Sequence, residues 1–468
     1  MCLPAPAVTG ILEPPRSLDA AMTQGRWRRR GLGLGLGLLG ALVAGGGAPV
    51  ARADSSNTPV SPSTLFTLQS ALKLPDWMQL EVAISAQPMF NPVGGLVNTG
   101  AYVQQTSVDL QLNSGLTRDS SQWREFDHWA VNLNGNHTTG NFSYGTEIGA
   151  IFPLQSASYP TGFWLTEASL ERQAGNGRVN VKGGILPLNP DFMEAPILNF
   201  YVHSSLNNTL NIQSNNLPIN PYASVGGVVN LRIQNDLNLR AGLFNLNSID
   251  AFSSYPLASF QGFQANVGGA GNGTVQFLQL DYTGSGLAPP QGKPIPACSQ
   301  PWALVRNFPR CKTPTTVANQ LPGGLLSVGA YNSNDPQTGD GLYGSLTLRT
   351  GLPIGLADRV WVGASYTPDA TVDFSPNFVG GGVVVQGAVP KRPLDVLVFG
   401  IGKGGFSTQA PPNLTSPYEG MAELGYMIML NETVQLQPTL QWIFNPSGGG
   451  SQPVPGILAA GMQINLNF

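Results

Sequence analysis

Charged residues are scarce in this chain of 468 residues. Asp, Glu, Lys and Arg together make up 10% of the sequence, whereas soluble globular domains carry about 25%. Uncharged Asn, Gln, Ser and Thr supply most of the polarity, and Gly and Pro are abundant, at 58 and 39 residues. A large soluble β-sandwich would need more Lys and Glu on its surface, so the composition argues against that class of protein.

Long apolar runs are missing from the chain after its first 53 residues. No later segment has the roughly 18 successive apolar residues with which a helix spans a bilayer. The net charge is −3, and it becomes −7 without residues 1–53, because that stretch holds six basic and two acidic residues. Such an acidic chain is a poor partner for nucleic acid, so we expect no nucleic-acid binding.

Histidine is also rare, and its placement does not suggest a metal site. His128, His137 and His203 are the only histidines, and no two of them have the spacing of paired metal ligands. We therefore expect no metal ion and no cofactor. A G-x-G-x-x-G pattern at residues 400–405 is followed by two prolines where a helix would have to begin, so it does not predict a dinucleotide site.

Cysteine is nearly absent, and its placement agrees with an exported protein. Cys298 and Cys311 lie in one Pro-rich segment without a neighbouring histidine. In an exported chain, such a pair predicts a disulfide within a loop. Two free or metal-binding thiols are the alternative.

The N-terminal residues themselves predict export. Arginines at residues 26–30 precede a Gly-rich apolar run at residues 31–50, and Ala51-Arg52-Ala53 has the form of a leader cleavage site. We expect residues 1–53 to be a cleaved export signal, with Met22 as a possible true start; a membrane-anchoring helix is the alternative. Residues 54–77 would then form a short periplasmic segment, and residues 78–468 a barrel.

The C-terminus shows the clearest strand pattern. In residues 458–468 every second residue is apolar, from Leu458 to Phe468, and small or polar residues lie between them. A period of two predicts a strand with one apolar and one polar face. Ending on such a strand with a terminal aromatic ring is typical of outer-membrane barrels. We expect the barrel-assembly machinery to recognise Phe468.

Alternating segments recur along the chain between Gly, Pro, Asn and Asp turns. Residues 229–243 predict a hairpin that turns at Asn235-Asp236. Pro438 predicts a bulge in its strand, because proline has no N–H to give to the ladder. At about ten residues a strand plus connections, the mature length suits an all-β fold: a transmembrane antiparallel β-barrel with a number of strands in the mid-teens. Barrels of that width enclose an aqueous channel.

Two segments resemble the carbohydrate-selective porin (OprB) family. Residues 183–192, GGILPLNPDF, are similar to a Gly-Lys-Leu-Asp…Phe segment of that family. Residues 418–449 contain Tyr-Glu, Glu-Leu-Gly-Tyr, Leu-Gln-Pro-Thr-Leu-Gln-Trp-Ile and Pro-Ser-Gly-Gly in that order, which resembles the family's C-terminal part. The resemblance implies sixteen antiparallel strands, a homotrimer and passive diffusion of sugars.

One irregular segment and several inward charges are the candidate pore elements. Residues 188–220 are rich in Pro and Asn and too irregular for a wall strand, so we expect them to fold into the lumen as a constriction loop. The candidate pore-lining residues are Lys182, Asp191, Glu194, Arg232, Arg240, Glu419 and Glu423. For each of them, a lumen or interstrand charge without a role in selectivity is the alternative.

Uncharged inward residues would contact the solute. We expect the amides and hydroxyl of Gln435, Gln437, Thr439 and Gln441 to exchange weak hydrogen bonds with a sugar, so that the solute can leave. The aromatic residues Tyr343, Trp361 and Trp442 are expected in the girdles at the membrane interfaces. A sugar-stacking track is the alternative for these rings.

The sequence therefore predicts an integral outer-membrane porin that passes carbohydrates and other small hydrophilic solutes by passive diffusion. A general or ion-selective pore of the same fold is the first alternative. A barrel enzyme that uses His203 and Ser204 is the second. The expected partners are outer-membrane lipid, small neutral solutes, and further copies of this chain in a trimer.

Overall fold

The computed structural model describes residues 68–114, 127–207, 217–246, 273–284, 286–293, 295–296, 316–335, 338–368, 375–390, 392–407, 416–431, 433–448 and 452–468. Residues 1–53, predicted as the export signal, lie outside these ranges, as do Cys298 and Cys311. The export signal and the disulfide therefore stay predictions.

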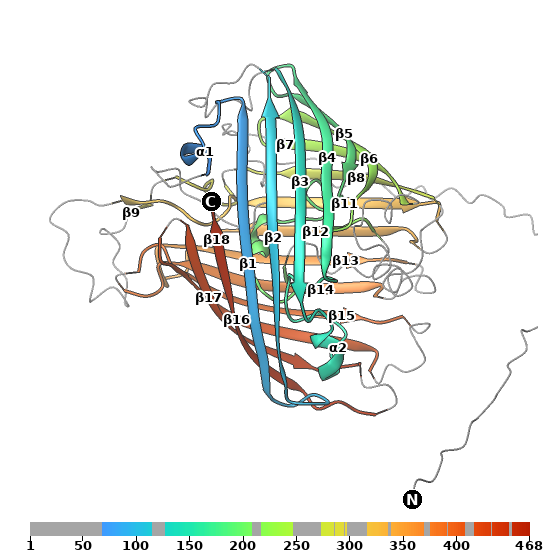
Figure 1. The fold of residues 1–468 in the computed structure, drawn as a ribbon, viewed down its shortest axis with the longest axis vertical. Helices are drawn as coiled ribbons and strands as arrows, with labels where there is room; N and C mark the ends of the chain where they lie inside the picture. The colour runs from blue at the N-terminus through green and yellow to red at the C-terminus, as the bar shows by residue number, and fades with distance from the viewer. Residues whose placement is uncertain are drawn as a thin grey trace, which may run out of the picture. The chain divides into compact units, whose positions relative to one another are not determined.

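Sixteen strands of the described residues close into one antiparallel barrel (Figure 1). Their order around the ring is β1-β18-β17-β16-β15-β14-β13-β12-β11-β8-β7-β6-β5-β4-β3-β2. The strands are β1 (Met78–Val93), β2 (Gly100–Asn113), β3 (His128–Gly140), β4 (Gly162–Ala174), β5 (Val179–Leu186), β6 (Ser224–Gln234), β7 (Leu237–Asn245), β8 (Thr274–Tyr282), β11 (Leu325–Ser333), β12 (Gly341–Leu348), β13 (Ala357–Tyr366), β14 (Asn377–Gln386), β15 (Val396–Gly405), β16 (Tyr418–Met429), β17 (Val434–Phe444) and β18 (Ile457–Asn467). The predicted barrel of about 16 strands is confirmed.

The remaining described elements are short. They are the helices α1 (Leu68–Ala71) and α2 (Tyr144–Ile148), the 3₁₀ helix η2 (Pro196–Phe200), and a separate pair formed by β9 (Ile295–Pro296) and β10 (Thr316–Val317). None of the described helices is both long and apolar enough to cross a membrane.

The predicted C-terminal strand closes the ring. β18 pairs antiparallel with β1, and Ser85 lies opposite Asn465 in the register. Phe468 extends this ladder, because its N–H donates to the Val82 carbonyl at 2.9 Å and its carbonyl accepts the Val82 N–H at 3.2 Å. The last residue therefore takes part in barrel closure.

Alternation along each strand separates an outer from an inner face. On β13, Val362 is 54% exposed on the outside, whereas its neighbour Trp361 is 1% exposed on the inside. Exposed aromatic rings stand near strand ends, among them Phe90, Phe163 and Trp442. An apolar outer face with aromatic residues near its edges is what a lipid bilayer requires of a barrel.

Two local predictions have different outcomes. The hairpin over residues 229–243 is confirmed, since β6 and β7 pair across the turn at Asn235-Asp236. The bulge at Pro438 is wrong: β17 keeps one register with β18 through Pro438, and with β16 on both sides of it. Pro438 interrupts the ladder pairs with β16. No extra residue is inserted, since the register is the same before and after the proline.

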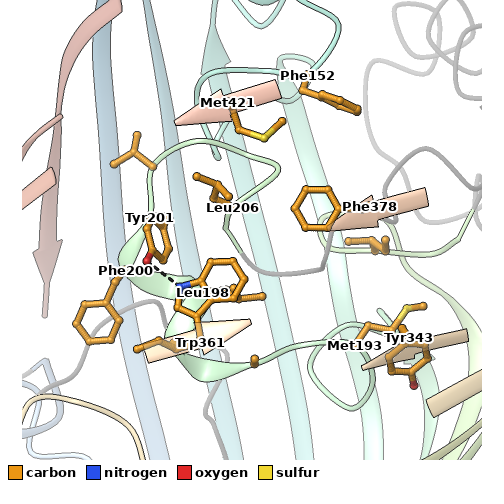
Figure 2. Close-up of a cluster of buried hydrophobic side chains, with 14 of the residues drawn as sticks. Phe152, Met193, Leu198, Phe200, Tyr201, Leu206, Tyr343, Trp361, Phe378 and Met421 are labelled. Atoms are coloured by element: carbon orange, nitrogen blue, oxygen red, sulfur yellow. Dashed lines mark hydrogen bonds between the residues drawn. The ribbon is translucent and has the colours of Figure 1, made fainter. Parts of the chain in front are cut away.

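Two connections lie inside the ring. Both start at the end of the barrel opposite the C-terminus. Their described parts are residues 141–161, between β3 and β4, and residues 187–207 and 217–223, between β5 and β6. Their apolar side chains form one buried cluster with the inner faces of strands across the barrel (Figure 2). Part of the interior is therefore packed protein rather than open channel.

Candidate functional site

The connection after β5 reaches the opposite wall of the barrel. The Tyr201 hydroxyl donates a hydrogen bond to the Phe399 carbonyl of β15 at 3.0 Å, and it accepts one from the Trp361 indole of β13 at 2.7 Å (Figure 2). In the ring, β15 stands eight strands away from β5 in either direction. Residues 187–207 therefore cross the interior.

Glycines on the opposite wall make room for this crossing. A Cβ at Gly382 would lie 2.4 Å from the Tyr201 hydroxyl oxygen, and a Cβ at Gly400 would lie 2.5 Å from the Tyr201 ring. The glycine pattern at residues 400–405 thus lies on a wall strand. Its glycines allow the close approach of an aromatic ring and do not form a dinucleotide site.

Glu423 of β16 holds the middle of the crossing segment. Its carboxylate accepts the backbone N–H groups of Val202 and His203, each at 2.8 Å, and the Thr439 hydroxyl at 3.1 Å. Gln437 donates to the Phe200 carbonyl at 2.7 Å. Glu423 is 1% exposed, so the predicted pore charge lies beneath this segment.

Glu419 lies four residues before Glu423, on the same face of β16, and it holds the other inward connection. It accepts the N–H groups of Ile151 and Phe152 at 2.9 to 3.1 Å, and that of Ser447 at 3.1 Å. Gln441 of β17 donates to the Leu154 carbonyl at 3.0 Å. Both carboxylates therefore bind loop backbone.

The two inward connections also bind each other. The Ser156 N–H donates to the Val202 carbonyl at 2.8 Å, and the Ser204 hydroxyl donates to the Pro153 carbonyl at 2.6 Å. Burial lowers the pKa of His203 to about 3, so this side chain is neutral at physiological pH. We refer to residues 141–161 and 187–207 together as the loop plug.

Ion pairs fasten the loop plug on the side of β4 to β8. Lys182 Nζ lies 2.6 Å from Asp191 Oδ2 and 3.7 Å from Glu167 Oε1. Arg240 Nε lies 2.9 Å from Asp281 Oδ2, and Arg240 also donates to the Asp191 carbonyl at 2.7 Å. Both cations stand on wall strands, and Asp191 stands on the crossing segment.

Glu194 lies three residues farther along the same segment. Burial raises the pKa of Glu194 to about 7, against the opposite effect of a hydrogen bond from Asn199 at 3.2 Å. Its carboxyl group is therefore only partly ionised near neutral pH. The carboxylates that contact Lys182 and Arg240 are those of Asp191 and Asp281 instead.

Asp191→Asn should destabilise the folded barrel. Lys182 is 2% exposed, and removing one partner of a buried ion pair costs roughly 3–5 kcal/mol. We expect the lower end of that range because Glu167 stays 3.7 Å away. Thermal unfolding in detergent measures the loss. The matched control, Lys182→Met with Asp191→Leu, should cost less; an equal loss in both variants would contradict an ionic origin.

An open polar cavity remains beside the loop plug. It holds about 1020 Å³ of space that is continuous with solvent, and its walls come from β1 to β4, β18 and the inward connections. Most lining side chains carry amides, hydroxyls or carboxylates. The polar ones are Ser85, Gln87, Gln105, Ser107, Asp109, Asn134, Asn136, Ser156, Tyr159, Thr166, Glu167, Asn207, Asn220, Gln463, Asn465 and Asn467.

Several predicted contact residues lie elsewhere. Gln437 and Gln441 face inward as expected, but the loop plug covers them, because they bind the carbonyls of Phe200 and Leu154. Gln435 and Thr439 are buried too. Arg232 stands beside the bulge next to the β6–β7 turn and does not line the described cavity.

The aromatic residues divide between the two faces. Trp442 is exposed on the outer face near the end of β17, as a girdle residue should be. The girdle prediction is wrong for Trp361 and Tyr343, which are buried against the loop plug; the Tyr343 hydroxyl donates to Gln279 at 2.8 Å. The alternation of period two could have predicted this burial, since both rings lie on the inward face of their strands.

A sequence comparison identifies the family. The description "Carbohydrate-selective porin, OprB family" matches residues 94–468. The chain belongs to this family. It is therefore an integral outer-membrane porin, and both family and fold point to a channel rather than an enzyme. No curated protein sequence matches the chain.

Comparison with solved structures shows the fold of one porin and gives lower scores for others. The high-pH structure of Pseudomonas putida OprB has a TM-score of 0.63 at 16% identity, covering 86% of this chain and 96% of that one. Its low-pH structure has a TM-score of 0.48 at 14% identity, covering 86% and 95%. A triple mutant of Rhodopseudomonas blastica porin has a TM-score of 0.41 at 9% identity, covering 84% and 100%.

Proposed function

We propose that this OprB-family porin passes small neutral sugars along the polar cavity between the loop plug and the wall formed by β1 to β4 and β18. One observation carries the proposal: the open part of the interior is lined by amides and hydroxyls, whereas the apolar side chains are gathered in the closed part. Such a lining exchanges hydrogen bonds with a polyhydroxylated solute as water is lost, and leaves binding weak.

The carboxylates of β16 have a positioning role in this proposal. Glu419 and Glu423 accept backbone N–H groups and are buried, so they set where the channel runs instead of touching solute. Lys182, Asp191 and Arg240 act in the same way on the other side of the loop plug. Glu167 and Asp109 are the carboxylates that face the cavity.

The geometry at His203 and Ser204 favours a channel over an enzyme. The Ser204 hydroxyl donates to the Pro153 carbonyl, and the His203 Nδ1 atom accepts the Ser205 N–H at 3.2 Å. A hydrolase would need the serine hydroxyl to donate to the imidazole. The Ser204 side chain therefore joins the two parts of the loop plug, whereas the His203 side chain binds backbone of its own segment.

Uptake into liposomes tests the proposal. Purified porin in multilamellar liposomes should allow swelling in neutral monosaccharides, at rates that fall steeply with solute size. In planar bilayers, sugar should reduce the salt current in a concentration-dependent manner. A pore that conducts salt but passes no sugar would instead support an ion-selective pore of the same fold.

The remaining features complete the proposal. We include a cleaved export signal at residues 1–53, a short periplasmic segment at 54–77, a loop disulfide between Cys298 and Cys311, and a homotrimer in the lipid bilayer. We also include recognition of Phe468 by the barrel-assembly machinery, supported by its place at the end of the closing strand. Cross-linking of membranes tests the trimer, and mass measurement before and after reduction tests the disulfide.

A further inference from the structure

A single aromatic ring stands in the otherwise aliphatic and polar lining of the cavity. Among the described residues that line it, Tyr159 of the β3–β4 connection is the only aromatic one. Asn136, Thr166 and Glu167 line the same cavity from the adjacent strands β3 and β4 and carry hydrogen-bonding groups. An aromatic ring beside amides, a hydroxyl and a carboxylate combines the two kinds of contact that a sugar ring offers.

The Tyr159 ring contacts a second aromatic ring. It meets the Tyr222 ring edge-on, with centroids 6.4 Å apart and an interplanar angle of 81°. Tyr222 in turn meets Trp164 edge-on at 5.2 Å and 82°. The Trp164 indole N–H donates to the Thr138 hydroxyl at 2.9 Å. Tyr159 thus belongs to a row of rings that is fixed to β3 and β4.

The backbone next to Tyr159 is fixed to the barrel wall as well. The side chain of Gln87 on β1 is 1% exposed; its carbonyl accepts the Ala157 N–H at 3.1 Å. Its amide group donates to the Ser156 hydroxyl at 2.8 Å and to Gln463 of β18 at 2.7 Å. Because the ring and its backbone are both held, Tyr159 is positioned before any solute arrives.

Glu167 faces the same cavity from β4. Its carboxylate accepts the Ser169 hydroxyl at 2.6 Å and lies 3.7 Å from Lys182 Nζ. A carboxylate in this position accepts hydroxyl hydrogen bonds from a neutral sugar.

We propose that Tyr159 is the specificity-determining residue of a subsite for pyranose sugars. The apolar C–H face of the pyranose ring packs on the tyrosine ring, while its hydroxyl groups bind Glu167 and the neighbouring amides. This inference rests on the proposed function and names its substrate class: cyclic sugars with an apolar ring face, preferred over open-chain polyols of the same size.

Liposome swelling with glucose and sorbitol tests the subsite, because the two solutes are alike in size and polarity but only glucose has a ring face. The wild-type porin should pass glucose faster than sorbitol. Tyr159→Ala should reduce that ratio by about two- to thirteenfold, the effect of roughly 0.5–1.5 kcal/mol from a lost aromatic contact. Tyr159→Phe should keep the ratio, since the ring remains.

Two controls keep the test decisive. Trp442→Leu removes an aromatic ring from the outer face and should leave the ratio unchanged. Tyr159→Leu keeps apolar bulk in case the alanine variant assembles poorly, and it should still lose the preference. An unchanged ratio in both Tyr159→Ala and Tyr159→Leu overturns the proposal of a subsite at Tyr159. It does not affect the proposal that the protein is a sugar porin. A wild-type pore that conducts salt but passes neither solute overturns the proposed function itself.

Discussion

Glu423→Ala is expected to raise the single-channel conductance several-fold and to weaken discrimination by solute size. The carboxylate accepts two backbone N–H groups of the crossing segment and one hydroxyl, all in a buried site. Hydrogen bonds to a charged group contribute about 1.5–3 kcal/mol each, and a buried donor left without an acceptor costs about 1–3 kcal/mol. Detachment of the middle of residues 187–207 from β16 widens the open part of the interior, within a barrel of sixteen strands.

Three further variants separate this effect from general damage. Glu423→Gln keeps one acceptor oxygen and should lie between the wild type and the alanine variant. Glu419→Ala with Glu423→Ala releases both parts of the loop plug and should have the largest conductance, because each carboxylate holds a different connection. Leu424→Ala changes the lipid-facing neighbour and should leave conductance unchanged. Wild-type conductance in the double variant would show that the other contacts of the loop plug hold it without these carboxylates.

Removal of Phe468 should strongly lower the amount of assembled porin in the outer membrane. The deletion loses both backbone hydrogen bonds to Val82, each worth about 1 kcal/mol. It also removes the terminal ring that we propose the barrel-assembly machinery recognises. Heat-modifiable mobility of the porin in membrane fractions measures how much barrel is assembled.

The two causes can be separated by comparing cells with purified protein. Phe468→Ser keeps the backbone bonds and removes the ring, so it should refold into detergent nearly as well as the wild type but assemble poorly in cells. Phe468→Tyr should assemble well in both. Equal losses of Phe468→Ser in detergent and in cells would contradict recognition of the ring and leave only its packing.

The barrel wall could be predicted from the sequence because its signals are local. Alternation at residues 458–468 and the turn at Asn235-Asp236 correspond to β18 and to the β6–β7 hairpin. Each strand needs one lipid-facing and one inward face, so its own residues carry the pattern. The bulge expected at Pro438 was wrong, since a proline can sit in the ladder without a shift of register.

The site could be predicted only in part. Alternation predicted that Lys182, Glu419 and Glu423 point inward. It did not predict that backbone N–H groups or an ion pair would cover these side chains. The same holds for Gln437, which binds a loop carbonyl. The cavity residues Gln87 and Tyr159 were missed, because nothing in their neighbourhoods along the chain distinguishes them from other polar or loop residues.

The sequence by itself determined that lipid surrounds a wall of paired strands, since apolar and polar residues alternate within each strand segment separately. Only the tertiary structure decided which part of the interior is packed and which part stays open. Two connections far apart in the sequence meet each other and β16 inside the ring, at contacts such as Ser156 with Val202 and Glu423 with His203. Such contacts depend on the closure of all sixteen strands, and no local pattern encodes them.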